Sequence, residues 1–332
     1  MPRLLATIFG QPERALGAAI FVTAIILAAS SPHFLTMSNL VNLVEAYSVI
    51  AILAAGVFVV LVCGGIDISF TATAAAAQYL AATLATTYQM PVIPTLVIAA
   101  AFGTALGALN AVLVHFLRVG SIIVTIATSS IYYALLIYIT DAHEIYNLPD
   151  WWAEPVVVYR TILASGDVVK IGLPTLVMLA VVLLTHFLMK HTRLGRQVYA
   201  FGGNPEAASR IGINVLGVQL FAYGYLGFLA AVGGFIQAYR VHQAVPTAMA
   251  GQELNVLAVA ILGGASLVGG KGSMAGVLLG VLFLAMLQNG LNLLGISSYF
   301  FGVVTGLAIL VSIVMTGYAE KRSTRRQRIQ AG

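Results

Sequence analysis

Long apolar segments separated by short polar breaks run along almost the whole chain. A helix needs about 20 apolar residues to cross the hydrocarbon core of a membrane, and the segments have about this length. Membrane-spanning strands would instead be about ten residues long and would alternate polar with apolar positions. The pattern therefore predicts an all-α polytopic membrane protein with about ten transmembrane helices. The expected spans are residues 15–30, 40–63, 68–87, 92–117, 121–140, 173–189, 215–240, 253–269, 273–293 and 298–317.

Composition supports this prediction. Of the 332 residues, 60% are hydrophobic and only 8% are charged, whereas soluble domains carry about 25% charged residues. We therefore expect a single transmembrane domain over residues 1–332, with short cytoplasmic tails at 1–14 and 318–332. Arg3 and Arg14 precede the first apolar segment without a cleavage-type stretch after it, which predicts a retained helix and no signal peptide.

Basic residues indicate the orientation, because cytoplasmic loops hold an excess of lysine and arginine. With ten spans and the N-terminus inside, residues 190–214, which contain four basic residues, fall in the cytoplasm together with the C-terminal sequence KRSTRRQR. The opposite side receives residues 141–172, which hold five acids and two bases. Topology therefore explains the net charge of +5, and no nucleic-acid partner is expected.

Two Gly-x-x-x-Gly steps make an internal repeat a candidate feature. Gly103 and Gly107 lie in the expected fourth span, and Gly276 and Gly280 lie in the ninth. An odd offset between the two spans would make the repeat inverted across the membrane, as in many transporters. The same spacing is common wherever membrane helices pack closely, so both interpretations stay open.

A carboxylate, Asp67, follows the glycine pair Gly64 and Gly65 between two apolar segments. An ionised acid within a membrane must face protein or water, so a helix break here would suit a site or gate at mid-membrane. Alternatively, Asp67 lies in a short interfacial turn and caps the next helix. Further polar groups follow at Ser69, Thr71, Thr73 and Gln78.

The sequence GGKGS invites comparison with a phosphate-binding loop. That loop would need glycine at position 265 and serine or threonine at position 272, but the chain has Ala265 and Gly272. The glycines are instead expected to allow close helix contact and a tight cytoplasmic turn. Glu253 and Asn255 open the preceding helix from the outer side, where an acid suits the positive end of the helix dipole.

No pattern in the sequence indicates catalysis or metal binding. The six histidines are scattered, and no Ser-His-Asp, His-Glu-x-x-His or paired-carboxylate arrangement occurs. The single cysteine, Cys63, excludes an internal disulfide framework. We therefore expect a protein that is not an enzyme and has no metal site or cofactor of its own. Glu45 is a candidate intramembrane acid unless its span begins later.

Three segments together resemble one protein family: RLGRQVYAFGGNPEAASRIGIN, GGIDIS and GGASLVGGKGSMAGVLLGVL…NGLNLLGISSYF. They are similar to the permease subunits of bacterial ABC importers for ribose, xylose, arabinose and related sugars, in the same order and over about residues 34–313. The resemblance implies an inner-membrane protein with both termini cytoplasmic, paired with a second permease that is identical or different. It also implies two cytoplasmic ATP-binding subunits, which bind ATP and magnesium, and a periplasmic solute-binding protein.

In this family the polar loop, here residues 190–214, resembles the segment whose coupling helix docks on the ATPase. Local physics predicts a short surface helix, because Asn204 can cap it, Pro205 suits its first turn and Gly212 can end it. The resemblance assigns ATPase coupling to Asn204, Pro205, Glu206, Ala207, Ala208, Arg210 and Gly212.

The chain departs from the family pattern at three positions. Phe70 and Thr71 stand where the family often has valine and glycine, and Asn255 stands where it has an acid. If these positions line the solute path, the solute or the gate differs from that of the commonest sugar permeases. The expected pathway or gate comprises Gly64, Gly65, Asp67, Ser69, Thr71, Gln78, Glu253 and Asn255.

Two other functions remain compatible with the sequence. An ion-coupled secondary transporter or channel would need no ATPase and could use Asp67 and Glu45 as ion sites. An ABC permease for a nucleoside or a signalling sugar would resemble the sugar permeases closely.

Overall fold

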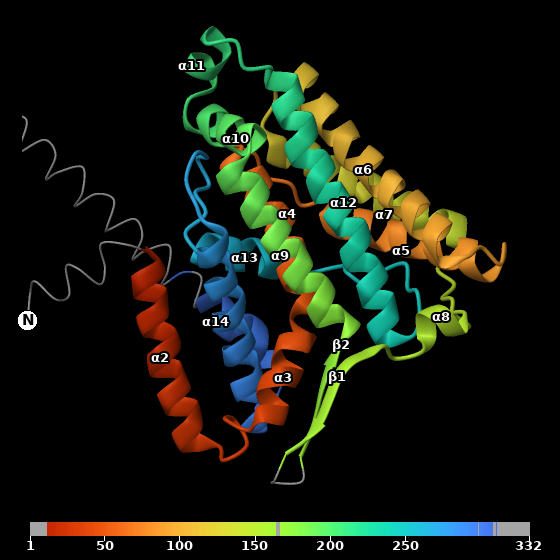
Figure 1. Cartoon of the computed structure of the whole chain (residues 1–332). Helices are drawn as coiled ribbons and strands as arrows, with labels where there is room; N and C mark the ends of the chain where they lie inside the picture. The colour runs from red at the N-terminus through yellow and green to blue at the C-terminus, as the bar shows by residue number, and fades with distance from the viewer. Residues whose placement is uncertain (1–11, 164–166, 298, 308–309, 311–332) are drawn as a thin grey trace, which may run out of the picture.

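Long helices packed side by side dominate the structure, a computed structural model that describes residues 12–163, 167–297, 299–307 and 310 (Figure 1). Within these residues, six helices are long and apolar enough to cross a membrane. A seventh span forms if the helices α3 (Met37–Ala46) and α4 (Ser48–Val62), which meet at an angle of 47°, count as one. The six are α2 (Pro12–Ser30), α6 (Val92–Leu117), α7 (Ser121–Thr140), α9 (Leu173–His191), α12 (Val215–Val241) and α14 (Met274–Leu293).

Two apolar segments are interrupted where one continuous span was expected. The span at 40–63 bends at Tyr47, between α3 and α4. The span at 253–269 is wrong in its second half, since α13 (Glu253–Leu262) is only 10 residues long. The chain then turns through Gly264 and Gly269, whose positive φ angles of 89° and 95° are incompatible with a continued helix. Helix α5 (Phe70–Thr86) has 17 residues, close to the expected 68–87.

The last expected span is described only in part. Residues 299–307 are helical, while the rest of 298–317 lies outside the described residues except for position 310. Residues 1–11 of the proposed N-terminal tail and the whole proposed C-terminal tail, 318–332, lie outside them as well.

The loop at 141–172 contains regular structure that the all-α prediction missed. A short helix, α8 (Asp150–Ala153), precedes an antiparallel hairpin of β1 (Val157–Ile162) and β2 (Val168–Gly172). The hairpin projects from the end of the bundle opposite α10 (Arg193–Gly203) and α11 (Pro205–Arg210) (Figure 1). We call these two ends the hairpin end and the α10–α11 end.

Helix α4 forms the centre of the protein. All of its residues except Ile50 are buried, and α9, α12, α13 and α14 pack around it. Helices α6 and α12 approach so closely at Gly103, Gly107 and Gly227 that a Cβ on any of them would overlap the backbone of the other helix. Gly276 and Gly280 play the same part between α14 and α13. Both Gly-x-x-x-Gly steps therefore mark close helix packing.

Candidate functional site

Helix α10 lies at the α10–α11 end and is anchored to the bundle by one face. It begins at the cap Thr192, whose Oγ1 accepts a hydrogen bond of 3.1 Å from the Gly195 amide. Val198 and Phe201 are buried beneath it, and the Tyr199 hydroxyl donates to the Gly272 carbonyl oxygen at 2.8 Å. Burial also raises the pKa of Tyr199, so its hydroxyl stays protonated as a donor. Sequence reasoning missed this helix, although Val198 and Phe201 already had helical spacing.

Helix α11 has the start and end that the sequence predicts. Asn204 Oδ1 accepts a hydrogen bond of 3.0 Å from the Ala207 amide, and Pro205 occupies the first turn. At the other end Gly212 adopts φ 86°, and the Ile213 amide donates to the Ala208 carbonyl at 3.1 Å. These contacts, which come from the helix's own flanking residues, cap both ends of the six-residue helix.

The side chains of α11 face solvent with one exception. Glu206 and Arg210 are 86% and 83% exposed, and their Oε2 and Nη2 atoms are 3.8 Å apart. So exposed a pair contributes little to stability, which leaves both side chains available to a partner. Ala208 is only 2% exposed and packs against the bundle, so its side chain supports α11 from below.

Backbone contacts connect α10 to the centre of the protein. A Cβ on Gly202 would overlap the carbonyl oxygen of Val62, the last residue of α4. The same oxygen accepts a hydrogen bond of 2.9 Å from the Gly270 amide, and Gly269 lies against Gly64. The glycines of GGKGS and of the pair before Asp67 therefore meet at one point, with no side chain between the segments.

Asp67 lies in the short connection between α4 and α5 and is 3% exposed. Its Oδ1 accepts hydrogen bonds from the amide and the hydroxyl of Ser69, both at 2.7 Å, and its Oδ2 accepts from Asn110 Nδ2 at 3.4 Å. Asn110 also donates to Ser69 Oγ at 2.6 Å. Asp67 thus organises the turn before α5 through Ser69, but it is not the N-cap of that helix as one interpretation expected, because Ser69 holds that position.

Other helices complete this polar cluster. The Ser121 hydroxyl of α7 accepts from the Ile66 amide at 2.8 Å, and Thr125 Oγ1 donates to the Ile66 carbonyl at 3.2 Å. Gly65 lies so close to Tyr223 of α12 that a Cβ would overlap the tyrosine hydroxyl. The connection at residues 63–69 therefore holds α4, α5, α6, α7 and α12 together.

A second polar contact joins the starts of α5 and α13. Thr71 Oγ1 donates a hydrogen bond of 2.6 Å to Glu253 Oε1. Gln78, further along α5, donates to the Val245 carbonyl at 2.8 Å and so holds residues 242–252. Asn255 Nδ2 donates only to Gln252 Oε1, at 3.1 Å, within the described contacts. The eight predicted pathway residues therefore lie in three places. Gly64 and Gly65 belong to the glycine contact, and Asp67 and Ser69 belong to the Asp67 cluster. The other four lie in α5 (Thr71 and Gln78) and α13 (Glu253 and Asn255).

Glu45 lies near the hairpin end. A Cβ on Gly172, where α9 begins, would come within 3.1 Å of both carboxylate oxygens of Glu45. Arg240, near the end of α12, donates to the carbonyl of Ala46 at 3.0 Å. Glu45 is therefore placed beside the N-terminus of α9 and near Arg240.

Comparison with known proteins identifies the family. Residues 39–313 match the family described as branched-chain amino acid transport system / permease component. The chain belongs to this permease family. As a permease component it is a transport subunit of an ABC importer, located in the bacterial inner membrane, and ATP binding resides in a separate subunit.

Three relatives illustrate the similarity. The ribose import permease protein RbsC of Escherichia coli K12 is 35% identical over 305 residues, which cover 90% of this chain and 91% of that protein. RbsC of Bacillus subtilis is 33% identical, with coverages of 89% and 90%. The D-allose transport system permease protein AlsC of Escherichia coli K12 is 31% identical, with coverages of 89% and 89%. No solved structure matches the chain significantly.

Proposed function

We propose that this permease imports a monosaccharide of the ribose or allose type, driven by an ATPase that docks on α11. The observation that carries the proposal is the exposed, independently capped helix α11, joined through α10 to the centre of the bundle. The printed names of the relatives supply the substrate class.

The charge distribution supports an orientation with the α10–α11 end in the cytoplasm. Lys190 of α9, Arg193 and Arg196 of α10 and Arg210 of α11 lie at this end, and α8 with the hairpin, in the acidic loop, lies at the other. By the positive-inside rule, this distribution supports a cytoplasmic position for both α11 and the start of α12. The hairpin end then faces the periplasm and a solute-binding protein.

We infer that movement passes from α11 to the solute path through backbone contacts. A shift of α11 would move α10, because only Asn204 separates the two helices. Gly202 would transmit that shift to the end of α4 and to the turn at residues 263–273, since no flexible side chain lies between them. Rigid helices would then carry the shift to the starts of α5 and α13, as in alternating access.

The Thr71–Glu253 pair is our candidate for the solute path. A hydroxyl and a carboxylate at two helix starts can hydrogen-bond the hydroxyl groups of a sugar. Thr71 is also one of the positions at which the chain departs from the family pattern. Asp67 is a less suitable solute or ion ligand, because hydrogen bonds from Ser69 and Asn110 occupy both of its oxygens.

We further propose ten membrane segments with an inverted repeat. The bent pair α3–α4, the short helices α5 and α13 and the segment at 298–317 would add to the six long helices. Helices α6 and α14, which carry the two glycine steps, run in opposite directions relative to α10, and this supports the repeat. A second permease, two ATP-binding subunits and a periplasmic solute-binding protein would complete the importer.

Uptake by reconstituted vesicles tests this function. The permease is co-purified with the ATPase and supplied with the binding protein and radiolabelled ribose or allose. We expect accumulation that requires ATP and is insensitive to an uncoupler. Accumulation without the ATPase, or its loss with the uncoupler alone, would instead establish an ion-coupled transporter.

A further inference from the structure

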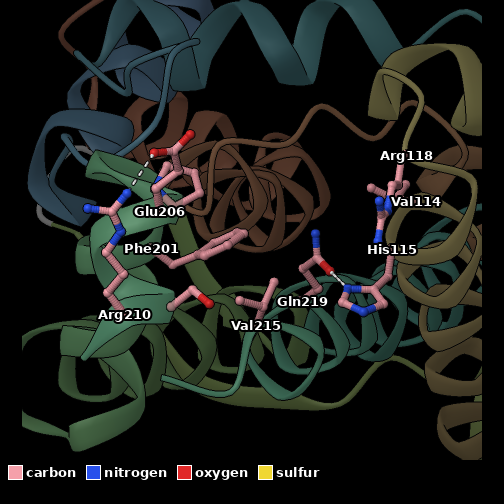
Figure 2. A pocket seen from close by; sticks show the side chains of 10 residues that line it. Val114, His115, Arg118, Phe201, Glu206, Arg210, Val215 and Gln219 are labelled. Atoms are coloured by element: carbon pink, nitrogen blue, oxygen red, sulfur yellow. Dashed lines mark hydrogen bonds and ion pairs between the residues drawn. The ribbon is translucent and has the colours of Figure 1, made fainter. Parts of the chain in front are cut away.

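A hollow of about 550 Å³ opens beside α11. Figure 2 shows His115 and Arg118, at the end of α6, on one side of it, and Glu206 and Arg210 of α11 on the other. Gln219, near the start of α12, lies between the two sides. The hollow is therefore lined by residues of α6, α10, α11 and α12 and faces the side proposed to be cytoplasmic.

The hollow has an apolar floor and a rim with excess positive charge. Phe201 and Val215 form much of the floor, and Phe201 is only 8% exposed. Arg118 and Arg210 stand on opposite sides of the rim, with Glu206 as the single acid among the lining residues. An apolar floor with a charged rim is typical of a protein-docking site, in which the buried centre supplies affinity and the rim supplies selectivity.

Both sides of the hollow are mechanically connected to the bundle. Helices α6 and α12 are in backbone contact at Gly103, Gly107 and Gly227, so they move as a pair. Near the hollow, His115 Nδ1 and Gln219 Oε1 add a hydrogen bond of 2.8 Å between them. A group seated in the hollow would therefore contact α11 and the α6–α12 pair at once.

We propose that this hollow receives an acidic segment of the ATP-binding subunit, in which apolar residues flank an aspartate or glutamate. The inference rests on the proposed function and adds a second contact to the one at α11. The acid pairs with Arg118, which ends α6 in a left-handed conformation with φ 54° and is exposed to solvent. The apolar residues cover Phe201 and Val215. Through this contact the ATPase acts on α6 and α12 as well as on α11.

Charge reversal at Arg118 tests the proposal in the complex with co-expressed ATPase. Arg193→Glu is the matched control, because Arg193 is an exposed cation at the same end that does not line the hollow. We expect Arg118→Glu to weaken ATPase retention roughly tenfold or more, as close interfacial charge pairs do, with Arg193→Glu close to wild type. Arg118→Gln, which removes charge without reversing it, should give a smaller loss and covers the case in which Arg118→Glu does not fold. Retention of the ATPase by both Arg118 variants at the wild-type level overturns the proposal.

Cross-linking identifies the occupant. In a Cys63→Ala background, a benzophenone on Ser209→Cys should capture a peptide of the ATPase that contains an acid, since Ser209 lines the hollow. Changing that acid to arginine should restore retention by Arg118→Glu. Capture of lipid or of a second permease instead, or an Arg118 effect confined to vesicles with anionic lipid, overturns the proposal.

If Glu206→Ala combined with Arg210→Ala lowers retention while Arg118→Glu does not, only the hollow proposal fails. If the wild-type chain retains no ATPase, the proposed function fails.

Discussion

Thr71 donates a hydrogen bond of 2.6 Å to Glu253, and this contact joins the start of α5 to the start of α13. The two residues are 182 positions apart, and both are interior helix starts beside an irregular segment. The family often has glycine at position 71, and glycine has no side chain that could make this contact. The pair is therefore a feature of this chain that can influence its gate or its solute.

Replacing Thr71 with valine should reduce or alter transport. Thr71→Val keeps the shape of the side chain but removes the hydroxyl, and loss of a hydrogen bond to a charged group costs about 1.5–3 kcal/mol. We expect sugar uptake to change roughly tenfold, measured in vesicles with the ATPase present. Thr83→Val is the control, because Thr83 donates only to the Tyr79 carbonyl of its own helix. Equal effects of the two variants would show that the Glu253 contact has no special role.

Substitution of Asn110 should destabilise the Asp67 cluster. Asn110→Leu removes the donor to Asp67 Oδ2 and to Ser69 Oγ, which leaves a buried carboxylate short of hydrogen bonds. We expect a loss of about 2 kcal/mol in stability, seen as a lower unfolding temperature in detergent.

The exchange Asp67→Asn with Asn110→Asp provides a stricter test of that cluster. It keeps one acid and one amide at the site, so it should be more stable than Asn110→Asp alone, which places two acids together. An exchange variant no more stable than the single variant would show that the two side chains do not act as a pair.

The sequence predicted those elements whose signals are local. The bounds of α6 and α7 agree with the expected 92–117 and 121–140, because Pro91 and the segment Arg118–Gly120 interrupt the apolar pattern on either side. Helix α11 was predicted from its own caps, Asn204 and Gly212. These features depend on residues a few positions apart, and tertiary contacts do not override them.

Contacts between distant residues could not be predicted. Asn110 is one of a few polar residues in a long apolar helix, and nothing near it in the sequence points to Asp67, 43 positions earlier. The end of α13 was missed because the apolar pattern continues past Leu262, although the backbone turns at Gly264. For the glycines, the sequence likewise showed only the Gly-x-x-x-Gly spacing, and the structure was needed to identify the residues that they contact.

A methyl group on Gly202 should disturb the link between α10 and α4. In Gly202→Ala the new Cβ would overlap the Val62 carbonyl oxygen, so α10 must shift or the pair must separate. Overpacking of this kind costs about 1–3 kcal/mol. We expect a lower unfolding temperature and weaker coupling of ATP hydrolysis to uptake. The adjacent Gly203→Ala is the control, because its Cβ would meet no atom within 4 Å. Similar losses in both variants would argue against a specific contact at Gly202.

Removal of the α11 cap should uncouple the ATPase while leaving the bundle intact. In Asn204→Ala the Ala207 amide loses its acceptor, which costs a helix about 1 kcal/mol. Because α11 has only six residues and packs against the bundle through Ala208 alone, that loss is enough to unfold it locally, whereas the buried helices do not depend on it. We expect the unfolding temperature of the protein to stay unchanged while uptake per ATP hydrolysed falls several-fold.

Asn214→Ala is the matched control: Asn214 caps α12 with the same geometry, its Oδ1 accepting from the Gly217 amide at 3.0 Å. Helix α12 is long and packed against α4, α5 and α6, so packing should keep it folded and coupling should persist. If Asn204→Ala couples hydrolysis to uptake as well as Asn214→Ala does, α11 does not need to be an ordered helix to receive the ATPase.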